Sequence, residues 1–369
     1  MLLPALRTPP ESTRWDKLAK KYILLLTFIA NIPLTFTKIV CMKKILKILG
    51  YFLLILIILV SGLLIYIKTA LPAVGGAPAL KIAYSPERVE RGKYLAHHVV
   101  VCMDCHSTRD WNKFAGPLVS GTLGMGGERF GREQGFPGVY YSKNITPAGI
   151  SRYTDGELFR LITTGVTKEG RAMFPVMPYA HYGRMDPEDI KSIIAYIRTL
   201  APIQNPVLES HSDFPMNFII NTIPGKASPQ TIPSRSDRTA YGAYMINASA
   251  CIECHTNVSK GRIIPELGFS GGREFVMRDG SIIRSANITQ DTATGIGTWT
   301  KEMFIGRFAG YADSSYKPRE VAAGEFNSIM PWNMYAKMTR EDIGAIYDYL
   351  ATVKGIKNIV VKYTPPQKK

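Results

Sequence analysis

Hydrophobic residues follow distinct patterns in different parts of the chain. An uninterrupted run of twenty uncharged, mostly aliphatic residues extends from Ile48 to Ile67, long enough to cross a hydrocarbon core of about 30 Å as a helix. Further on, apolar residues recur at intervals of three and four, which indicates amphipathic helices. The stretches between these helices are rich in Gly, Pro and Ser and are typical of loops. The pattern therefore predicts one membrane helix followed by an all-α globular part.

Two amphipathic helices stand out because each has both a start signal and a periodic apolar face. One begins after Asp186 and the other after Thr339, and both have acidic residues in the first turn, as helix starts commonly do. The apolar positions at i, i+3, i+4 and i+7 are Ile190, Ile193, Ile194 and Ile197 in the first helix, and Ile343, Ile346, Tyr347 and Leu350 in the second. Each helix is expected to pack through this face.

These two helices close two copies of one larger unit, which repeats with a period of about 150 residues. Each copy runs through a Gly-x-Tyr helix, Cys-x-x-Cys-His, a glycine pair, Asn-Ile-Thr, a helix start, Met-Pro and the closing helix. The matching positions are Gly92 and Gly242, Gly126 and Gly271, Asn144 and Asn287, Thr154 and Thr300, and Met177 and Met330. We predict one domain at 84–203 (the first repeat), a proline-containing linker at 204–236, and a second domain at 237–356 (the second repeat).

Half of the formal net charge of +16 lies in residues 1–70, which contain the membrane helix. Lys43, Lys44 and Lys47 precede the apolar run and only Lys68 follows it closely, so the positive-inside rule predicts that the long C-terminal part lies outside the cytoplasm. A cleaved secretory signal is the alternative, but the run is longer than a signal core and residues 71–73 form a poor cleavage site. Nucleic acid is not an expected partner, because no basic cluster interleaved with aromatic residues is present.

The first 41 residues do not fit this topology. A second apolar run from Tyr22 to Thr37 would form a hairpin and leave the basic residues before it on the outer side, against the charge rule. Met42, followed by two lysines, has the character of a natural start. We therefore expect residues 1–41 to be an over-extended N-terminus and residues 42–70 to be the membrane anchor.

Two Cys-x-x-Cys-His motifs carry the chemistry. They contain Cys102, Cys105 and His106 in the first repeat, and Cys251, Cys254 and His255 in the second. This motif is the attachment signature of c-type haem, in which both thiols bind the macrocycle and the histidine binds the iron. A four-cysteine zinc site would place its second pair about 15 to 20 residues on, and a disulfide explains neither histidine. We predict two covalently bound haem c groups with His106 and His255 as axial ligands.

The second axial ligand of each iron is expected to be a methionine, because a thioether saturates the iron and raises its potential. Met177 and Met330 each precede a proline at the same place in the two repeats. Met173, Met185, Met334 and Met338 are rivals, although most methionines fill cores. His181 is a further alternative to Met177, whereas His97 and His98 read best as structural histidines.

Taken together, these motifs over residues 84–356 resemble the class I cytochrome c fold. The tandem arrangement is also similar to the cytochrome c subunits of bacterial membrane-bound alcohol and gluconate dehydrogenases. The resemblance implies that the first and last helices of each domain cross near Gly92 or Gly242 and enclose one haem. It also implies electron transfer from a catalytic partner to quinone. Those subunits usually carry three haem motifs and a C-terminal amphipathic anchor, whereas this chain carries two motifs and an N-terminal span.

The expected fold class is thus all-α, with two tandem class I cytochrome c domains after one N-terminal transmembrane helix. The expected function is non-enzymatic electron transfer between a periplasmic or membrane dehydrogenase-type donor and a respiratory acceptor such as a terminal oxidase. The expected location is the bacterial inner membrane, crossed once, with both haem domains in the periplasm. The alternative is a dihaem peroxidase, which needs one haem with an open site.

Overall fold

The computed structural model describes residues 20, 21, 24 and 36–367. The chain divides into two compact units, Met1–Ile65 and Tyr66–Lys369. The predicted over-extended segment 1–41 lies mostly outside the described residues.

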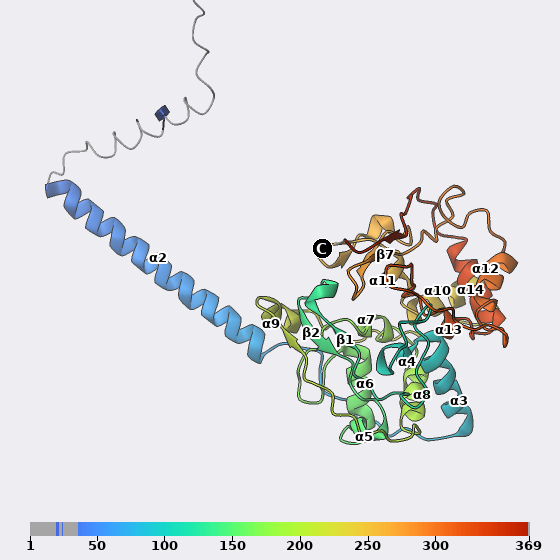
Figure 1. Ribbon diagram of the computed structural model, residues 1–369. Coiled ribbons are helices and arrows are strands. Elements are labelled where there is room, and N and C mark those ends of the chain that lie inside the picture. Colours follow the sequence, from blue (N-terminus) through green and yellow to red (C-terminus); the bar gives the residue numbers. More distant parts are fainter. Residues whose placement is uncertain (1–19, 22–23, 25–35, 368–369) are drawn as a thin grey trace, which may run out of the picture. The chain divides into compact units, whose positions relative to one another are not determined.

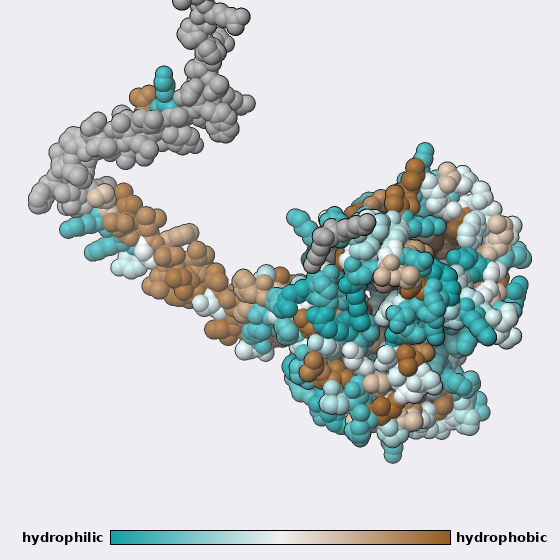
Figure 2. Space-filling view, viewed as in Figure 1, coloured by the Kyte–Doolittle hydropathy of each residue, from teal (hydrophilic) through white to brown (hydrophobic). Residues whose placement is uncertain are grey.

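The first unit is dominated by helix α2 (Phe36–Thr69), which ends in the second unit. Among the described residues, α2 is the one helix that is long and apolar enough to cross a membrane, between Met42 and Thr69, by length and composition. Its side chains from residue 42 onward are nearly all exposed, and Figure 2 shows them as a largely hydrophobic surface. A helix that is apolar all round fits a lipid environment.

The second unit contains the same series of helices twice (Figure 1). The first repeat has α3 (Pro86–Tyr94), the π-helical turn η1 (Leu95–Val99), α4 (Cys102–His106), η2 (Arg132–Gln134), α5 (Pro147–Ile150), α6 (Asp155–Thr164), α7 (Tyr179–Tyr182) and α8 (Pro187–Ile197). The linker has α9 (Met216–Ile219) and η3 (Ile220–Thr222). The second repeat has α10 (Arg238–Ala248), α11 (Cys251–His255), η4 (Pro265–Leu267), α12 (Lys301–Ala309), α13 (Trp332–Tyr335) and α14 (Arg340–Leu350).

The predicted helix starts are confirmed by their caps. The Thr154 hydroxyl accepts from the backbone N–H of Glu157 at the start of α6, and the Thr339 hydroxyl accepts from Asp342 at the start of α14. Such bonds satisfy amide groups that lack a partner within the helix. The predicted apolar faces of α8 and α14 are buried, apart from the half-buried Tyr347.

The first and last helices of each repeat cross at a glycine, as the resemblance implied. Helix α3 packs against α8, and α10 packs against α14. A Cβ atom on Gly92 would lie 1.8 Å from the carbonyl oxygen of Ser192, and one on Gly242 would lie 1.9 Å from that of Ala345. No other residue type fits this close approach of two backbones.

The all-α expectation is wrong, because the second unit also contains three small antiparallel sheets. Their strands are β1 (Arg129–Phe130), β2 (Gly138–Tyr141) and β3 (His211–Ser212), then β4 (Val258–Ser259) and β5 (Arg262–Ile263), then β6 (Glu274–Val276), β7 (Ile282–Arg284) and β8 (Tyr363–Thr364). Six of the strands form within the segments predicted as loops, whereas β3 lies in the predicted linker and β8 follows the second predicted domain. The β6–β7 hairpin turns at Asp279-Gly280, a sequence that favours tight hairpins.

The two repeats share one hydrophobic core that contains buried residues of both. They also hold each other through two matching hydrogen bonds. The Tyr94 hydroxyl of α3 donates to Asp342 of α14, and the Tyr244 hydroxyl of α10 donates to Asp189 of α8 at 2.6 Å. Each repeat thus gives a tyrosine to the other, as in a twofold interface. The domain boundaries at 84–203, 204–236 and 237–356 stay a prediction.

Candidate functional site

Each Cys-x-x-Cys-His motif forms a short helix that begins after a residue in the left-handed conformation. Val101 precedes α4 with φ 49° and ψ 42°, and Ala250 precedes α11 with φ 49° and ψ 35°. This backbone region is unfavourable for residues other than glycine, and most of all for a β-branched valine. Strain of this kind gathers at functional sites, and here it recurs at the same position of both motifs.

The four thiols of the motifs are free. Burial raises the pKa of Cys102 and of Cys251 to about 12, and it also raises the pKa values of Cys105 and Cys254. Thiols of this kind are protonated at neutral pH when nothing is bound to them. Among the described residues, no group of three or more His, Cys, Asp or Glu side chains could hold a metal ion.

The histidine of each motif is fixed by a backbone carbonyl. Nδ1 of His106 lies 2.6 Å from the carbonyl oxygen of Lys143, and Nδ1 of His255 lies 2.8 Å from that of Ala286. A carbonyl oxygen only accepts, so Nδ1 carries the proton and Nε2 keeps its lone pair. Burial lowers the pKa of both imidazoles and favours their neutral form. A neutral imidazole held through its second nitrogen is a well-prepared iron ligand.

The predicted glycine pairs explain how these carbonyls come so close. The N–H of Gly126 donates to the carbonyl of His106, and that of Gly271 donates to the carbonyl of His255. Both glycines have positive φ, and a Cβ on either would lie within 2.6 Å of the backbone of Lys143 or Ala286. Glycine therefore allows the loop that orients the histidine to pack against the motif.

The Asn-Ile-Thr sequences shape the same loops. The side-chain amide of Asn144 donates to the carbonyl of Ile203, and that of Asn287 donates to the carbonyl of Ile356, both at 2.7 Å. The Asn side-chain oxygens accept from the backbone and hydroxyl of Thr146 and Thr289. Each asparagine immediately follows the residue whose carbonyl binds the histidine, so it helps to fix that carbonyl in place.

The two Met-Pro sequences adopt the same tight turn. The N–H two residues after each methionine donates to the methionine carbonyl at 2.8 Å, in Met177 and in Met330 alike. Pro178 has φ −78° and ψ 55°, and Pro331 has φ −78° and ψ 63°, values typical of an inverse γ-turn. The structure therefore supports the equivalence of Met177 and Met330 that was inferred from their positions.

A buried tyrosine ties each Met-Pro segment to the motif of its own repeat. Tyr182, five residues after Met177, donates to the carbonyl of Val100 at 3.4 Å, and Tyr335, five residues after Met330, donates to that of Ser249 at 3.0 Å. Burial, together with the nearby motif thiols, raises the pKa of both tyrosines well above 10. Each methionine-bearing segment is thus anchored just before the first cysteine of the motif.

The rival ligands are placed differently. Met185, Met334 and Met338 are buried in the core, as expected of methionines that fill space, and Met173 is half-buried. His181 is hydrogen-bonded to Asn247 and Glu253. His97 bonds to the Tyr196 hydroxyl and His98 to the Met334 carbonyl, contacts that are compatible with structural histidines.

Comparison with known proteins adds to this geometry. No family model matches the chain. It is 25% identical over 294 residues to the cytochrome c subunit of alcohol dehydrogenase (quinone) from Gluconacetobacter polyoxogenes, covering 75% of this chain and 58% of the relative. It is 26% identical over 280 residues to the gluconate 2-dehydrogenase cytochrome c subunit from Pantoea cypripedii, covering 72% and 59%. The chain is similar to dehydrogenase cytochrome c subunits.

A shorter match of 26% identity over 164 residues is to a diheme cytochrome c-type protein from Cereibacter sphaeroides, covering 42% of this chain and 53% of the relative. These relatives confirm the predicted resemblance, since they are named as cytochrome c subunits of dehydrogenases and as a diheme cytochrome c. The chain spans a little over half the length of the relatives it matches. The paired thiols and the neutral, oriented imidazoles fit a covalently bound haem.

In this protein the methionine-bearing segment of one repeat meets the Cys-x-x-Cys-His motif of the other. Nδ1 of His181 in α7 donates to the side-chain oxygen of Asn247 at 3.0 Å, and its Nε2 lies 2.9 Å from the Glu253 carboxylate inside the second motif. The Asn247 side-chain amide donates back to the His181 carbonyl at 2.9 Å. We call this contact the closed seam. It fills the space between Met177's segment and the second motif with a hydrogen-bonded network.

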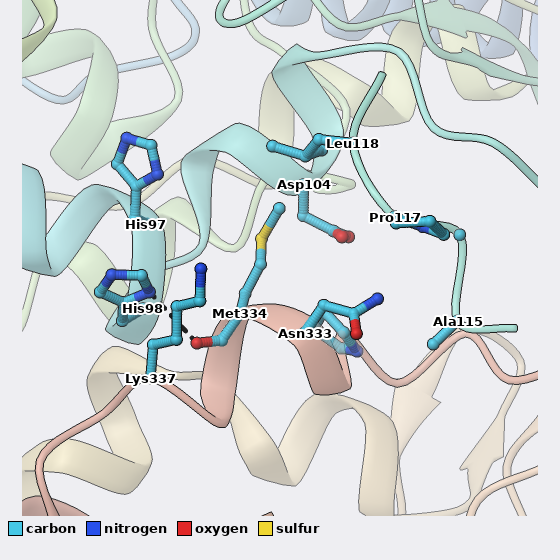
Figure 3. Close-up of a pocket in the computed structure, with 11 residues that line it drawn as sticks. His97, His98, Asp104, Ala115, Pro117, Leu118, Asn333, Met334 and Lys337 are labelled. Atoms are coloured by element: carbon cyan, nitrogen blue, oxygen red, sulfur yellow. Dashed lines mark hydrogen bonds between the residues drawn. The ribbon is translucent and has the colours of Figure 1, made fainter. Parts of the chain in front are cut away.

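The matching contact on the other side holds a cavity of about 190 Å³, which we call the open seam (Figure 3). Figure 3 shows His98 bonded to the Met334 carbonyl of α13, with Asp104 of the first motif across the cavity. Asp104 pairs with Arg109 at 2.8 Å. Burial raises the pKa of Asp104, although Arg109 opposes this. The buried side-chain nitrogen of Asn333 has no protein partner here.

Several residues that build the site were not singled out from the sequence. The carbonyls of Lys143 and Ala286 carry no side-chain signal, although each precedes a recurring Asn-Ile-Thr. Tyr182 and Tyr335 could have been found, because both stand five residues after the Met of Met-Pro. His181 was recognised only as a lone histidine, since Asn247 and Glu253 lie more than sixty residues away.

Proposed function

We propose that this cytochrome binds two haem c groups, one in each repeat. The first is attached to Cys102 and Cys105 with His106 and Met177 as axial ligands, and the second to Cys251 and Cys254 with His255 and Met330 as axial ligands. When bound, each haem supplies a one-electron ferric–ferrous couple. The observation that carries the proposal is the pair of matching histidine–carbonyl bonds, to Lys143 and Ala286, which prepares one Nε2 atom in each repeat.

The roles of the protein residues follow from this arrangement. The carbonyls of Lys143 and Ala286 fix the tautomer and orientation of the two imidazoles. The thioethers of Met177 and Met330 would complete the coordination and leave no position open to a substrate, which favours electron transfer over peroxide chemistry. The matching turns at Pro178 and Pro331 support the same ligand type in both repeats.

For the location, we propose a single membrane span by α2, with both repeats in the periplasm of a bacterial inner membrane. The lysines before the apolar run and the apolar surface of α2 support this topology. For the partners, we propose a dehydrogenase subunit as electron donor and a respiratory component, such as a terminal oxidase, as acceptor. The names of the relatives support a dehydrogenase donor.

Haem content and absorption spectra of the purified protein test the proposal. We expect two haems per chain, a weak red band of methionine-ligated ferric haem, and a ferrous spectrum that does not change with carbon monoxide. Met177→Ala and Met330→Ala should each open one site to carbon monoxide, whereas the core variant Met185→Leu should not. One haem per chain would refute the count. Carbon monoxide binding by the unaltered protein would refute the ligand set and favour the dihaem peroxidase.

A further inference from the structure

The linker presents an exposed apolar face around α9, which we call the linker patch: Phe214, Pro215, Ile219 and Ile223. Phe214 is 80% exposed, Ile219 44% and Ile223 38%. Residues 215, 219 and 223 are spaced by four and therefore lie on one side of the short helix formed by α9 and η3. The opposite side, including Phe218, is half-buried. The segment is therefore amphipathic, and the linker patch is the side that points away from the protein.

The linker patch is tied to the place where the candidate membrane span ends. Lys68, in the last turn of α2, belongs to the second unit. Its ammonium group donates to the carbonyl of Asn217 at 2.8 Å and lies 4.8 Å from the centre of the Phe218 ring. Helix α9 is therefore within hydrogen-bond distance of a residue at the end of the span.

We propose that the linker patch inserts into the lipid interface and gives the cytochrome a second membrane contact beside α2. This inference rests on the proposed membrane anchor. A helix in the interface buries its apolar face about 5–10 Å into the boundary between headgroups and acyl chains. The position of Lys68 places α9 near that boundary, so lipid is the apolar medium available to the patch.

The charges beside the patch are compatible with this environment. Asp213 precedes Phe214, and its carboxylate pairs with Arg132 at 2.5 Å. The negative charge of Asp213, which would otherwise oppose contact with an anionic membrane surface, is thus balanced by Arg132. Lys68 itself supplies a positive charge at the expected headgroup level. A second contact point would restrict rotation of the two repeats about the end of the span and so bias which surface faces a partner.

Photolabelling of the full-length protein tests the inference. The holoprotein would be placed in vesicles of phosphatidylethanolamine and phosphatidylglycerol that contain a lipid with a photoreactive acyl chain. Labelled peptides would be identified by mass spectrometry. We expect label in residues 48–67 of α2 and in residues 214–223. Residues 359–361 are the internal control, because Ile359 and Val361 are 79% and 66% exposed but lie in the segment that follows the second repeat.

Variants separate the patch from the anchor. Phe214→Ser combined with Ile219→Ser should reduce the label in residues 214–223 several-fold and leave α2 labelling and the haem spectrum unchanged. Ile359→Ser is the matched exposed control and should change neither label. Label in α2 with none in 214–223, or equal label in 214–223 and 359–361, would overturn the inference and leave the anchor intact. Absence of label from α2 would overturn the anchor and the inference together.

Discussion

The two repeats differ least where they would hold haem and most at the closed and open seams between them. Inside each repeat, a left-handed residue precedes the motif, a carbonyl orients the histidine, and a γ-turn presents the methionine. At the seams the resemblance ends. His181 joins Asn247 and Glu253 at the closed seam, whereas the open seam keeps a cavity bordered by Asp104.

The proposed haem sites account for this difference. Two equal sets of ligands would require the same backbone at both sites, even at the cost of strain at Val101 and Ala250. The seams need only be packed and neutral, so different side chains can meet this requirement at each seam. As a result, the pKa values of two acids at the same position of the two motifs shift in opposite directions. The His181 hydrogen bond lowers the pKa of Glu253, whereas burial raises the pKa of Asp104. The surroundings of the two attachment motifs are therefore electrostatically unequal.

The shared framework can be broken at its helix crossings, where we expect the largest effect. Gly92→Ala and Gly242→Ala would each place a methyl group within 2 Å of a backbone carbonyl on the facing helix. We expect each to lower the free energy of unfolding by about 3 kcal/mol or more, because two packed backbones must separate. Chemical denaturation of the holoprotein measures the change.

Gly306→Ala is the control for this pair. Gly306 lies inside α12, and a Cβ there would meet nothing within 4 Å. The substitution should therefore stabilise the protein by about 0.5–1 kcal/mol through helix propensity. Equal effects at all three glycines would show that the crossings are not as tight as described.

The crossings also illustrate what the sequence reveals. The repeat, the two motifs and the closing helices were predictable because each depends on local spacing or on a cap within a few residues. The sheets were missed for two reasons. Several strands are only two residues long, and β3 and β8 come from segments more than sixty residues after the strands they pair with. Only the Asp279-Gly280 turn offered a local signal.

The tyrosines exchanged between the repeats offer the next largest effect. Tyr94→Phe and Tyr244→Phe each remove a hydrogen bond to a carboxylate, which contributes about 1.5–3 kcal/mol. We expect Tyr94→Phe to cost more. Asp189 keeps two bonds of 2.8 Å from Arg91, whereas the fully buried Asp342 keeps Tyr241 and a 3.2 Å contact with the half-exposed Arg235. The free energy of unfolding of the two variants tests the order, and a larger loss for Tyr244→Phe would contradict it.

The closed seam can be made to resemble the open one by His181→Met, since Met334 occupies the matching position. The variant leaves the Asn247 and Glu253 side chains without His181, although Arg273 still lies 3.6 Å from Glu253. We expect a loss of about 1–2 kcal/mol in the free energy of unfolding at neutral pH. The exchange Met334→Leu, which conserves volume at the open seam, should cost less. No loss in His181→Met would mean that the network contributes nothing to holding the repeats together.

These seams were beyond prediction from the sequence because they depend on how the two repeats dock. Tyr94 was recognised as part of the Gly-x-Tyr landmark, but its partner Asp342 is 248 residues away. Likewise, Asn247 and His98 each lie four residues before the first cysteine of their motif, and no local pattern indicates that both side chains hydrogen-bond a backbone carbonyl of the other repeat's methionine-bearing segment. The sequence repeat therefore predicts the contacts inside each repeat but not the contacts between the two repeats.

His97→Asn, beside the open seam, should have the smallest effect, seen only in the pH dependence of stability. Burial, followed by the nearby charges of His98, Lys93 and Lys337, lowers the pKa of His97 to about 4. Between pH 6.5 and 4 the unfolded chain therefore binds a proton that the folded protein does not, and stability falls as the pH falls. The variant should recover about 1 kcal/mol of the stability lost between pH 7 and pH 5. Part of the slope should persist, because burial also lowers the pKa of His98. Denaturation curves across this pH range measure how the free energy of unfolding changes with pH. His211→Asn, at an exposed position of β3, is the control. An unchanged pH dependence in His97→Asn would show that His97 does not cause the loss of stability at low pH.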